Sequence, residues 1–242
     1  MNKKNKVRVC LTTNLFNYYD DDKSTVVVID LLRATSVIST AFEYGINEII
    51  PVRTVEEALK YKNLTNHIIA AERNTLLIKG FKYGNSPYHY MNSKISGKSL
   101  ALTTTNGTKA IHIAKKHKLI TASFINIDAV VDFLSKDNND VVILCSGWKG
   151  LFNLEDTICA GALAEKLIAT KYFEANCDSL SSSIQLYLKG KNNLYNYLST
   201  SSYRLRNSSE EIKKDTHFCL NPTFISDIVP IFFKEKLIKA KF

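Results

Sequence analysis

Short apolar segments of strand length alternate with longer segments of helical periodicity through most of this chain. The segments expected to be strands are 7–11, 25–29, 48–52, 67–70, 99–102, 119–122 and 141–145. The segments expected to be helices are 35–44, 54–61, 108–117, 127–134 and 155–169. Such alternation is typical of α/β domains. Because the expected strands are apolar on both faces, the sequence predicts a three-layer α/β/α sandwich with a largely parallel or mixed sheet.

The 242 residues are expected to form one domain, 1–242, because no linker rich in Pro, Gly or Ser interrupts the chain before about residue 170. From about residue 171 the composition shifts towards Ser and Asn, which predicts a less regular mixture of helix and loop. Two apolar pieces, 225–231 and 237–238, are candidates for late strands. Pro230 in the first of them indicates a sheet edge or a strand end.

Several classes of protein are not expected from this sequence. No apolar run reaches the roughly 18 residues of a membrane span, and the basic amino terminus lacks the pattern of a signal peptide, so we expect no membrane association and a cytoplasmic protein. The five cysteines are scattered, without Cys-x-x-Cys, which predicts reduced thiols. The net charge of +9 is spread along the chain, which favours a small polyanionic partner over nucleic acid. A homo-oligomer is compatible with the sequence.

The first polar cluster is Asp30-Leu-Leu-Arg33-Ala-Thr35, directly after the apolar run 26–29. In α/β sheets, ligands bind beyond the carboxyl ends of the strands. A carboxylate leaving a buried strand requires a cation partner, which here is either Arg33 or a divalent ion. Two interpretations therefore stay open: an internal Asp30–Arg33 salt bridge with Thr35 as a helix cap, or a functional site.

The second cluster begins with Glu72-Arg73-Asn74 and continues into a loop with two glycines that contains Asn85-Ser86-Pro87. Glycines allow close backbone approach to a ligand, and Ser86-Pro87 resembles a helix cap and first turn whose amides can bind an oxyanion. A plain surface loop is the alternative for this segment.

The third cluster, Thr103-Thr104-Thr105-Asn106-Gly107-Thr108, lies between an expected strand and an expected helix. Its hydroxyl and amide donors at a helix start form a neutral cradle suited to phosphate. It is not a P-loop, which requires Gly-x-x-x-x-Gly-Lys-Ser/Thr. Ordinary helix capping explains one or two of these residues but not all six.

The fourth cluster is Cys145-Ser146-Gly147, followed by Glu155-Asp156. Carboxylates at a helix start interact favourably with the helix dipole, which is the simple explanation for Glu155-Asp156. Together with the carboxylates of the first two clusters they form an oxygen-rich set suited to Mg²⁺. Cys145 does not fit a phosphatase nucleophile, because the Cys-x5-Arg pattern requires arginine where Leu151 stands.

The four clusters, in this order, resemble the 2-phosphosulfolactate phosphatase family over nearly the whole chain, most strongly over 25–165. The segment from Asp215 to Cys219 also resembles the family's ending, whereas Tyr203 stands where the family pattern leads us to expect histidine. The resemblance implies an α/β/α fold and Mg²⁺-dependent hydrolysis of a phosphorylated acid, 2-phospho-3-sulfolactate, to 3-sulfolactate and phosphate, a step of coenzyme M biosynthesis.

On this hypothesis the catalytic residues are Asp30, Arg33, Glu72 and Arg73. The expected Mg²⁺ ligands, direct or through water, are Asp30, Glu72, Glu155 and Asp156. The expected substrate-binding residues are Asn85, Ser86, Thr104, Thr105, Asn106, Gly107, Thr108, Ser146 and Gly147. Direct attack by water and a phospho-aspartate formed on Asp30 both stay open as mechanisms.

The alternative function is a catalytically silent anion-binding or regulatory protein on the same fold. The four carboxylates argue against it, because acidic residues near the ligand bring no benefit to a protein that only binds anions.

Overall fold

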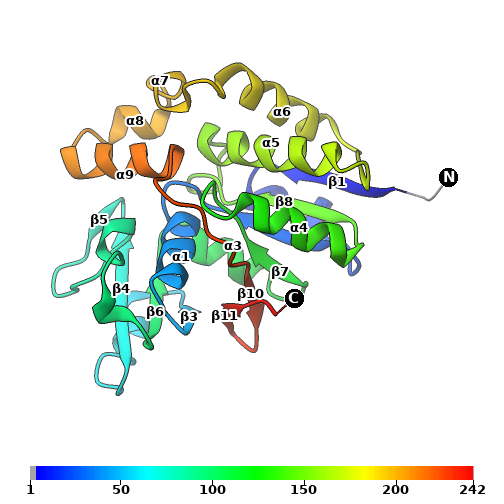
Figure 1. The fold of residues 1–242 in the computed structure, drawn as a ribbon. Helices are drawn as coiled ribbons and strands as arrows, with labels where there is room; N and C mark the ends of the chain where they lie inside the picture. Colours follow the sequence, from blue (N-terminus) through cyan, green and yellow to red (C-terminus); the bar gives the residue numbers. More distant parts are fainter. Residues whose placement is uncertain (1–3, 242) are drawn as a thin grey trace.

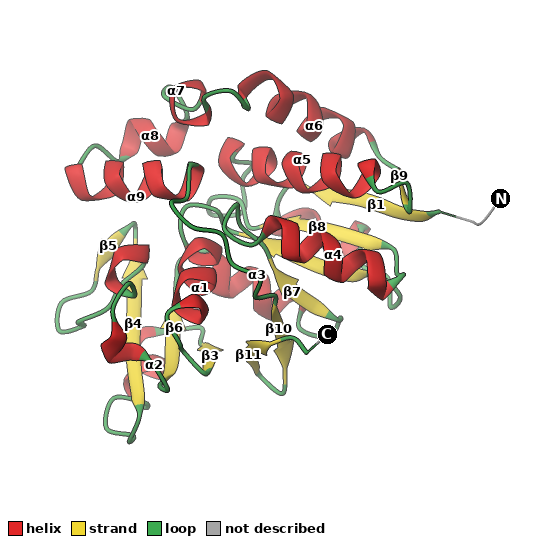
Figure 2. Ribbon diagram, viewed as in Figure 1, coloured by secondary structure: helices red, strands yellow, loops and turns green. Residues whose placement is uncertain are grey.

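The computed structural model describes residues 4–241 and has the predicted α/β architecture, a mixed sheet flanked by helices (Figure 1; Figure 2). In sheet order the strands are β5 (Leu76–Leu77), β4 (His67–Arg73), β6 (Ser99–Thr103), β3 (Glu48–Pro51), β11 (Lys236–Lys239), β10 (Pro230–Phe233), β7 (Leu119–Thr121), β2 (Thr25–Ile29), β8 (Val141–Cys145), β1 (Asn5–Cys10) and β9 (Phe173–Ala175).

The helices of the first part of the chain follow the predicted strands. They are α1 (Ala34–Glu43), α2 (Val55–Leu59), α3 (Gly107–Ala114), α4 (Ile127–Asp137) and α5 (Leu154–Ala169). The part from about residue 171 is mainly helix and loop, as expected, with α6 (Asp178–Gly190), α7 (Leu194–Tyr197), α8 (Ser202–Arg206) and α9 (Glu210–Leu220), and it also contributes the short strands β9, β10 and β11. Three 3-10 turns complete the described elements: η1 (Thr13–Tyr18), η2 (Pro87–His89) and η3 (Ser93–Ile95). Within residues 4–241, no helix combines the length and the apolar character that a membrane crossing requires.

A hairpin near the carboxyl terminus joins two groups of parallel strands. Within each group the neighbouring strands run parallel, β4-β6-β3 on one side and β7-β2-β8-β1-β9 on the other. β10 and β11 pair antiparallel with each other and join the groups through single residue pairs, Ile231 with Ile120 and Leu237 with Ile49. Figure 1 shows the two groups on opposite sides of this hairpin. We call them the two arms of the sheet.

The late strands differ in part from the expectation. Residues 225–229 form a loop rather than a strand, and β10 begins at Pro230. Pro230 therefore marks a strand end, as predicted, but the hairpin lies in the interior of the sheet order rather than at its edge. A strand can begin at proline because the missing N–H is then outside the ladder.

Alternation along β2 explains the continuous apolar run from Val26 to Ile29. Val27 and Ile29 pack into a core with residues of α4 and α5, whereas Val26 and Val28 pack into a second core with residues of α1 and α3. Successive strand residues face opposite sides of the sheet. All four side chains are buried because helices cover both sides. Burying each contributes roughly 1.5–3 kcal/mol, so the strand is held from both layers.

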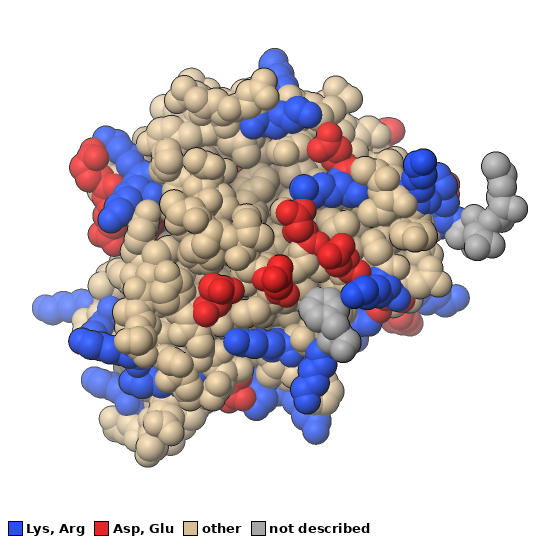
Figure 3. Space-filling model, in the orientation of Figure 1, with Lys and Arg blue, Asp and Glu red and all other residues tan. Residues whose placement is uncertain are grey.

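Charged side chains are distributed over the surface rather than gathered on one element. On the face shown in Figure 3, Lys and Arg lie mainly towards the periphery and are interspersed with Asp and Glu. The acidic residues of the motifs do not contribute to this surface, because Asp30, Glu72, Glu155 and Asp156 are all buried.

Candidate active site

Asp30 follows the last residue of β2 and is held by the turn that begins α1. Its backbone N–H donates to Thr35 Oγ1 at 3.2 Å, and its backbone carbonyl accepts from the Thr35 N–H at 2.9 Å. The Asp30 carboxylate accepts a long hydrogen bond, 3.4 Å from the Ala34 N–H, and the Ser146 hydroxyl also interacts with it. Thr35 lies inside α1, whose cap position is Arg33, so the expected capping role of Thr35 is wrong.

Arg33 binds a carboxylate from the other end of the chain. Its Nη1 forms a buried ion pair with Asp215 Oδ2 on α9, and its Nη2 donates to the Thr75 carbonyl at 2.8 Å. Burial opposes the charge on Arg33, but Tyr203 and Asp215 outweigh it, and the pKa of Arg33 is raised. The Asp30–Arg33 salt bridge is therefore wrong, and Asp30 forms no ion pair within the described chain.

The Asp30 carboxylate is surrounded by negative charge. Burial raises its pKa well above the ordinary value, and the carboxylates of Asp156 and Glu72 raise it further. The first residue of α3, Gly107, packs directly on this group, because a Cβ there would lie 2.8 Å from Asp30 Oδ2 and 2.6 Å from Ala34 Cβ. Glycine is thus required for the amino end of α3 to approach Asp30.

Asp156 joins the loops that follow β2 and β8. Its Oδ1 accepts from the Leu31 N–H at 2.9 Å, and its Oδ2 accepts from Ser146 Oγ at 2.9 Å, the Gly147 N–H at 3.0 Å and Asn153 Nδ2 at 3.1 Å. Burial raises the pKa of Asp156 to about 6, although these hydrogen bonds lower it. Asp156 therefore acts chiefly as an anchor, with most of its acceptor capacity in use.

Glu72 has a similar anchoring role on the other arm of the sheet. Its Oε1 accepts from the Thr75 N–H at 2.5 Å and Thr105 Oγ1 at 3.0 Å, and its Oε2 accepts from the Thr105 N–H at 3.3 Å. Arg73, the next residue of β4, extends to the opposite face of the sheet and donates to Thr103 Oγ1 at 2.9 Å. The side chains of Glu72 and Arg73, both predicted to be catalytic, therefore lie on opposite faces of the sheet.

A narrow cleft lies between the loops that follow β2 and β8 on one arm and β6 on the other. Its free volume is about 10 Å³, room for about one water molecule. Glu155 faces this cleft, and one of its oxygens accepts from Ser201 Oγ at 2.5 Å. The residues that form the wall of the cleft are Asp30, Leu32, Asn106, Gly147, Trp148, Asn153, Glu155, Tyr203 and Arg206.

Several residues of this cleft have no role in the sequence hypothesis, among them Tyr203 and Arg206. The phenol hydroxyl of Tyr203 is buried and makes no hydrogen bond of normal geometry; burial raises its pKa, and a weaker interaction with Thr216 lowers it. The guanidinium of Arg206 lies 4.6 Å from the centroid of the Trp148 ring at the side of the cleft. Both belong to the Ser- and Asn-rich part of the chain, whose composition carries no motif for them.

The other predicted substrate-binding residues are divided between this cleft and separate pockets. Asn106 and Gly147 line the cleft, whereas Thr104 and Thr108 hydrogen-bond with each other at 3.0–3.3 Å. Asn85 and Ser86 line a pocket of about 220 Å³ beside Arg33. Ser86 is the cap residue of η2 with Pro87 in the first turn, as predicted, but its Oγ donates to Asp215 at 2.7 Å instead of accepting from the N–H groups of the turn. The thiol of Cys145 is buried and its pKa is raised, consistent with a packing role.

The predicted four-carboxylate metal centre is not gathered at one point. Within the described residues, no three His, Cys, Asp or Glu side chains lie close enough together to hold one metal ion. Asp30 and Glu155 do share the cleft. This pair fits Mg²⁺, which is commonly held by one or two carboxylates while waters and substrate phosphate complete its coordination.

The fold and the site together define an α/β protein with a carboxylate-lined cleft beside the amino end of a helix, a combination expected of a phosphate-ester hydrolase. The sequence profile of the 2-phosphosulpholactate phosphatase family matches residues 10–235. The chain belongs to this family, as its four motifs indicate.

Several relatives carry the name "Probable 2-phosphosulfolactate phosphatase". The one from Caldanaerobacter subterraneus subsp. tengcongensis is 42% identical over 224 residues, which cover 90% of this chain and 92% of the relative. The one from Clostridium novyi is 36% identical over 218 residues, 89% of this chain and 92% of the relative. The one from Thermotoga petrophila is 47% identical over 161 residues, 62% of this chain and 70% of the relative.

Proposed function

We propose that this protein is a Mg²⁺-dependent phosphate monoester hydrolase that converts 2-phospho-3-sulfolactate to 3-sulfolactate and phosphate, a reaction that serves coenzyme M biosynthesis. The observation that carries the proposal is the pair of buried carboxylates, Asp30 and Glu155, which share one cleft without an ion-pair partner among residues 4–241. The names of the relatives supply the substrate.

The electrostatics of the cleft favour a bound cation. Two carboxylates with no cationic partner are costly to bury, and Asp156 and Glu72 add negative charge to the surroundings of Asp30. Asp30 and Glu155 would hold the ion, and Asp156 and Glu72 would position the loops around it. Bound Mg²⁺ supplies positive charge against the phosphate oxygens and activates a water molecule.

The protein's own donors would orient the phosphate. The amino end of α3 presents Gly107 to Asp30, and the backbone N–H groups of such a helix start stabilise negative charge. Asn106, at the cap position of α3, is itself fixed because its Oδ1 accepts from the Lys149 N–H at 3.0 Å. Donors held in place before the reaction stabilise developing charge without reorganisation.

Tyr203 and Arg206 would bind the remaining polar groups of the substrate. The unpartnered hydroxyl of Tyr203 is available to donate a hydrogen bond, and its raised pKa keeps it protonated at neutral pH. Arg206 provides a permanent positive charge for the carboxylate or sulfonate. The cleft is narrow, so substrate entry requires Arg206 or the adjoining side chains to move.

Release of phosphate from 2-phospho-3-sulfolactate tests the proposal. We expect release with Mg²⁺, none after chelation, and recovery when Mg²⁺ is restored. Asp30→Asn is expected to abolish turnover while the circular dichroism spectrum is unchanged. If the wild-type protein binds the substrate but releases no phosphate with Mg²⁺, the silent anion-binding alternative is correct.

Stereochemistry at phosphorus separates the two mechanisms that the sequence leaves open. With a thiophosphate analogue of the substrate that is made chiral by oxygen isotopes, direct attack by water is one in-line displacement and inverts the configuration. Attack by Asp30 followed by water is two displacements and retains the configuration, and rapid acid quenching with the phosphate substrate should then trap phosphate on the Asp30 peptide.

A further inference from the structure

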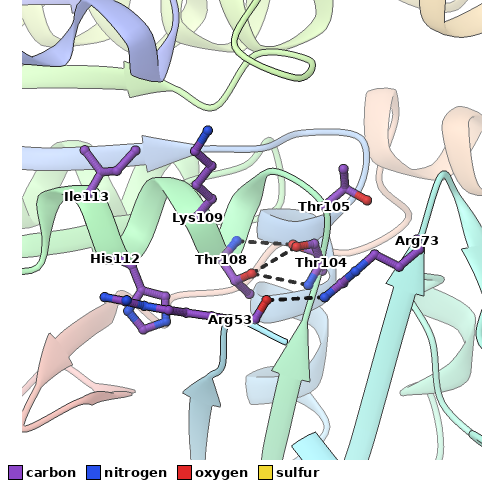
Figure 4. Close-up of a pocket in the computed structure, with 8 residues that line it drawn as sticks. All are labelled: Arg53, Arg73, Thr104, Thr105, Thr108, Lys109, His112 and Ile113. Atoms are coloured by element: carbon purple, nitrogen blue, oxygen red, sulfur yellow. Dashed lines mark hydrogen bonds between the residues drawn. The ribbon is translucent and has the colours of Figure 1, made fainter. Parts of the chain in front are cut away.

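A second and larger cavity lies on the other side of the 104–108 loop from the acidic cleft. Its volume is about 500 Å³, and Figure 4 shows the side chains of its wall arranged around it. The residues that line it are Arg53, Arg73, Thr104, Thr105, Thr108, Lys109, His112 and Ile113. None of them lines the acidic cleft, so the two cavities are distinct.

The wall of this basic pocket carries three cationic side chains and no carboxylate. Arg73 donates to neutral oxygens, the Glu72 carbonyl at 2.7 Å, Thr103 Oγ1 at 2.9 Å and the Arg53 carbonyl at 3.3 Å. Arg53 and Lys109 form no ion pair with any described residue. The positive charge of the pocket is thus largely uncompensated.

The acidic groups around the pocket form no ion pair with its cations. Glu72 borders the pocket through Thr105 and accepts from hydroxyl and backbone donors rather than from Arg73. The Glu57 carboxylate accepts a hydrogen bond from the backbone N–H of Arg53 at 2.8 Å, and not from its guanidinium. Arg73 lowers the pKa of Glu56, but only as the smallest of several causes, after hydrogen bonds at the start of α2. Glu235 is paired with Lys115 at 3.1 Å.

The His112 ring of this wall is poorly satisfied. Both of its nitrogens are shielded from solvent and make no hydrogen bond of normal geometry, and the Pro51 carbonyl is the one backbone group that interacts with the ring, although buried polar atoms are normally satisfied. In Figure 4 the His112 ring lies beside Arg53, and the Thr104 and Thr108 hydroxyls lie between these residues and Arg73. Ile113 adds an apolar side to the wall.

We propose that the basic pocket is a second anion site, which binds a small organic molecule through a phosphate or phosphonate-like group. Arg53, Arg73 and Lys109 supply charge that matches a tetrahedral oxyanion. The cavity lies in the size range of small-molecule sites and has room for an organic group beside His112 and Ile113. The wall of this pocket shares no residue with the acidic cleft, although Arg73, Thr104, Thr105 and Thr108 were expected from the sequence to serve the hydrolase.

Calorimetric titration of the full chain with phenylphosphonate, in the presence of chelator, tests the site. The double variant Arg53→Gln/Lys109→Gln removes two exposed charges and is not expected to disturb folding. We expect its affinity to fall about tenfold or more, because charged hydrogen bonds are lost. Lys62→Gln/Lys116→Gln removes the same net charge from outside the pocket and is expected to bind like wild type.

Further experiments locate the bound ligand and define its chemical class. Asp30→Asn is expected to keep phenylphosphonate binding, and inorganic phosphate is expected to bind more weakly than phenylphosphonate. Crystals soaked in tungstate should show anomalous scattering between Arg53, Arg73 and Lys109. The proposal is overturned if the Arg53→Gln/Lys109→Gln variant binds like wild type, if Asp30→Asn abolishes binding, or if inorganic phosphate binds as tightly as phenylphosphonate.

Discussion

The carboxylate of Asp215 on α9 forms a buried ion pair with the guanidinium of Arg33, which lies 182 positions earlier in the chain. The side chains of Arg33 and Asp215 are 4% and 0% exposed. This contact fixes the helical carboxyl-terminal part against the loop that follows β2. It also leaves Asp30, three residues before Arg33, without a cationic partner, and that is the state in which a buried carboxylate attracts a metal ion.

Replacing Asp215 with alanine is expected to destabilise the protein by about 3–5 kcal/mol, because Arg33 is left as an uncompensated buried charge. Chemical denaturation of the metal-free protein measures this change. Glu210→Gln, on the same helix, removes an exposed carboxylate whose partner is Lys213 and should leave the midpoint unchanged. Equal effects of the two variants would show that the buried pair has no special role.

Asp30→Asn is expected to stabilise the metal-free protein while abolishing turnover. The pKa of Asp30 is raised by folding, so the folded state holds its proton more tightly than the unfolded state does. The unfolding free energy therefore falls as pH rises above the ordinary value of 3.8, and the variant lacks this decline.

Thermal melts at pH 5 and pH 8 measure this effect, with exposed Asp132→Asn as the control. A gain of 1 kcal/mol corresponds to about 2–4 °C in a domain of this size. The advantage of Asp30→Asn should be larger at pH 8 than at pH 5. An advantage that is absent or does not grow with pH contradicts the assigned pKa shift.

Mg²⁺ is expected to raise the melting temperature of the wild-type protein, and removal of the metal should reverse the gain. Saturation at about 100 times Kd corresponds to about 2.7 kcal/mol. Glu155→Gln should need a higher Mg²⁺ concentration for the same gain. Glu165→Gln, on the same helix, does not line the cleft and should follow the wild-type curve. Identical Mg²⁺ curves for the wild type and Glu155→Gln would exclude Glu155 as a ligand.

The fold was predictable where local pattern determines structure. The run from Val26 to Ile29 is apolar at every position, and it forms a central strand because helices cover both of its faces. The pairing of the hairpin β10–β11 was not predictable. It depends on contacts such as that between Ile231 and Ile120. These two residues are distant in sequence, and neither belongs to a motif.

The sequence named Asp30 and Glu155, which share the cleft, but it did not predict which residues the site side chains contact. The sequence placed Asp30 beside Arg33 along the chain, yet the structure pairs Arg33 with Asp215 because α9 folds over the loop. Glu72 and Arg73 are adjacent, but strand alternation sends them to different faces. Arg206 has no motif, and only the packing of α8 brings it to the cleft.

Tyr203→Phe is expected to lower kcat about ten- to hundredfold with little loss of stability. The hydroxyl makes no hydrogen bond of normal geometry within the described residues, so its removal costs at most a weak contact with Thr216, whereas a bond to the substrate would be lost. Tyr90→Phe provides the opposite case, because the Tyr90 hydroxyl donates to the Gly84 carbonyl at 2.7 Å. That variant should lose stability and keep its kcat. Unchanged kcat in Tyr203→Phe would exclude contact between this hydroxyl and the reacting substrate.

Arg206→Gln is expected to raise KM for 2-phospho-3-sulfolactate about tenfold while kcat changes little, because Arg206 meets a part of the substrate remote from the reacting phosphate. Arg204→Gln is the matched control on α8, since the Arg204 guanidinium lies 3.9 Å from the Tyr195 ring centroid and outside the cleft. Raising the salt concentration should increase KM for wild type and Arg204→Gln more than for Arg206→Gln, because only the first two keep the cleft charge that salt screens. Equal KM values for Arg206→Gln and Arg204→Gln would show that the substrate's second anionic group does not contact Arg206. They would also contradict entry of the substrate beside Trp148 and Arg206.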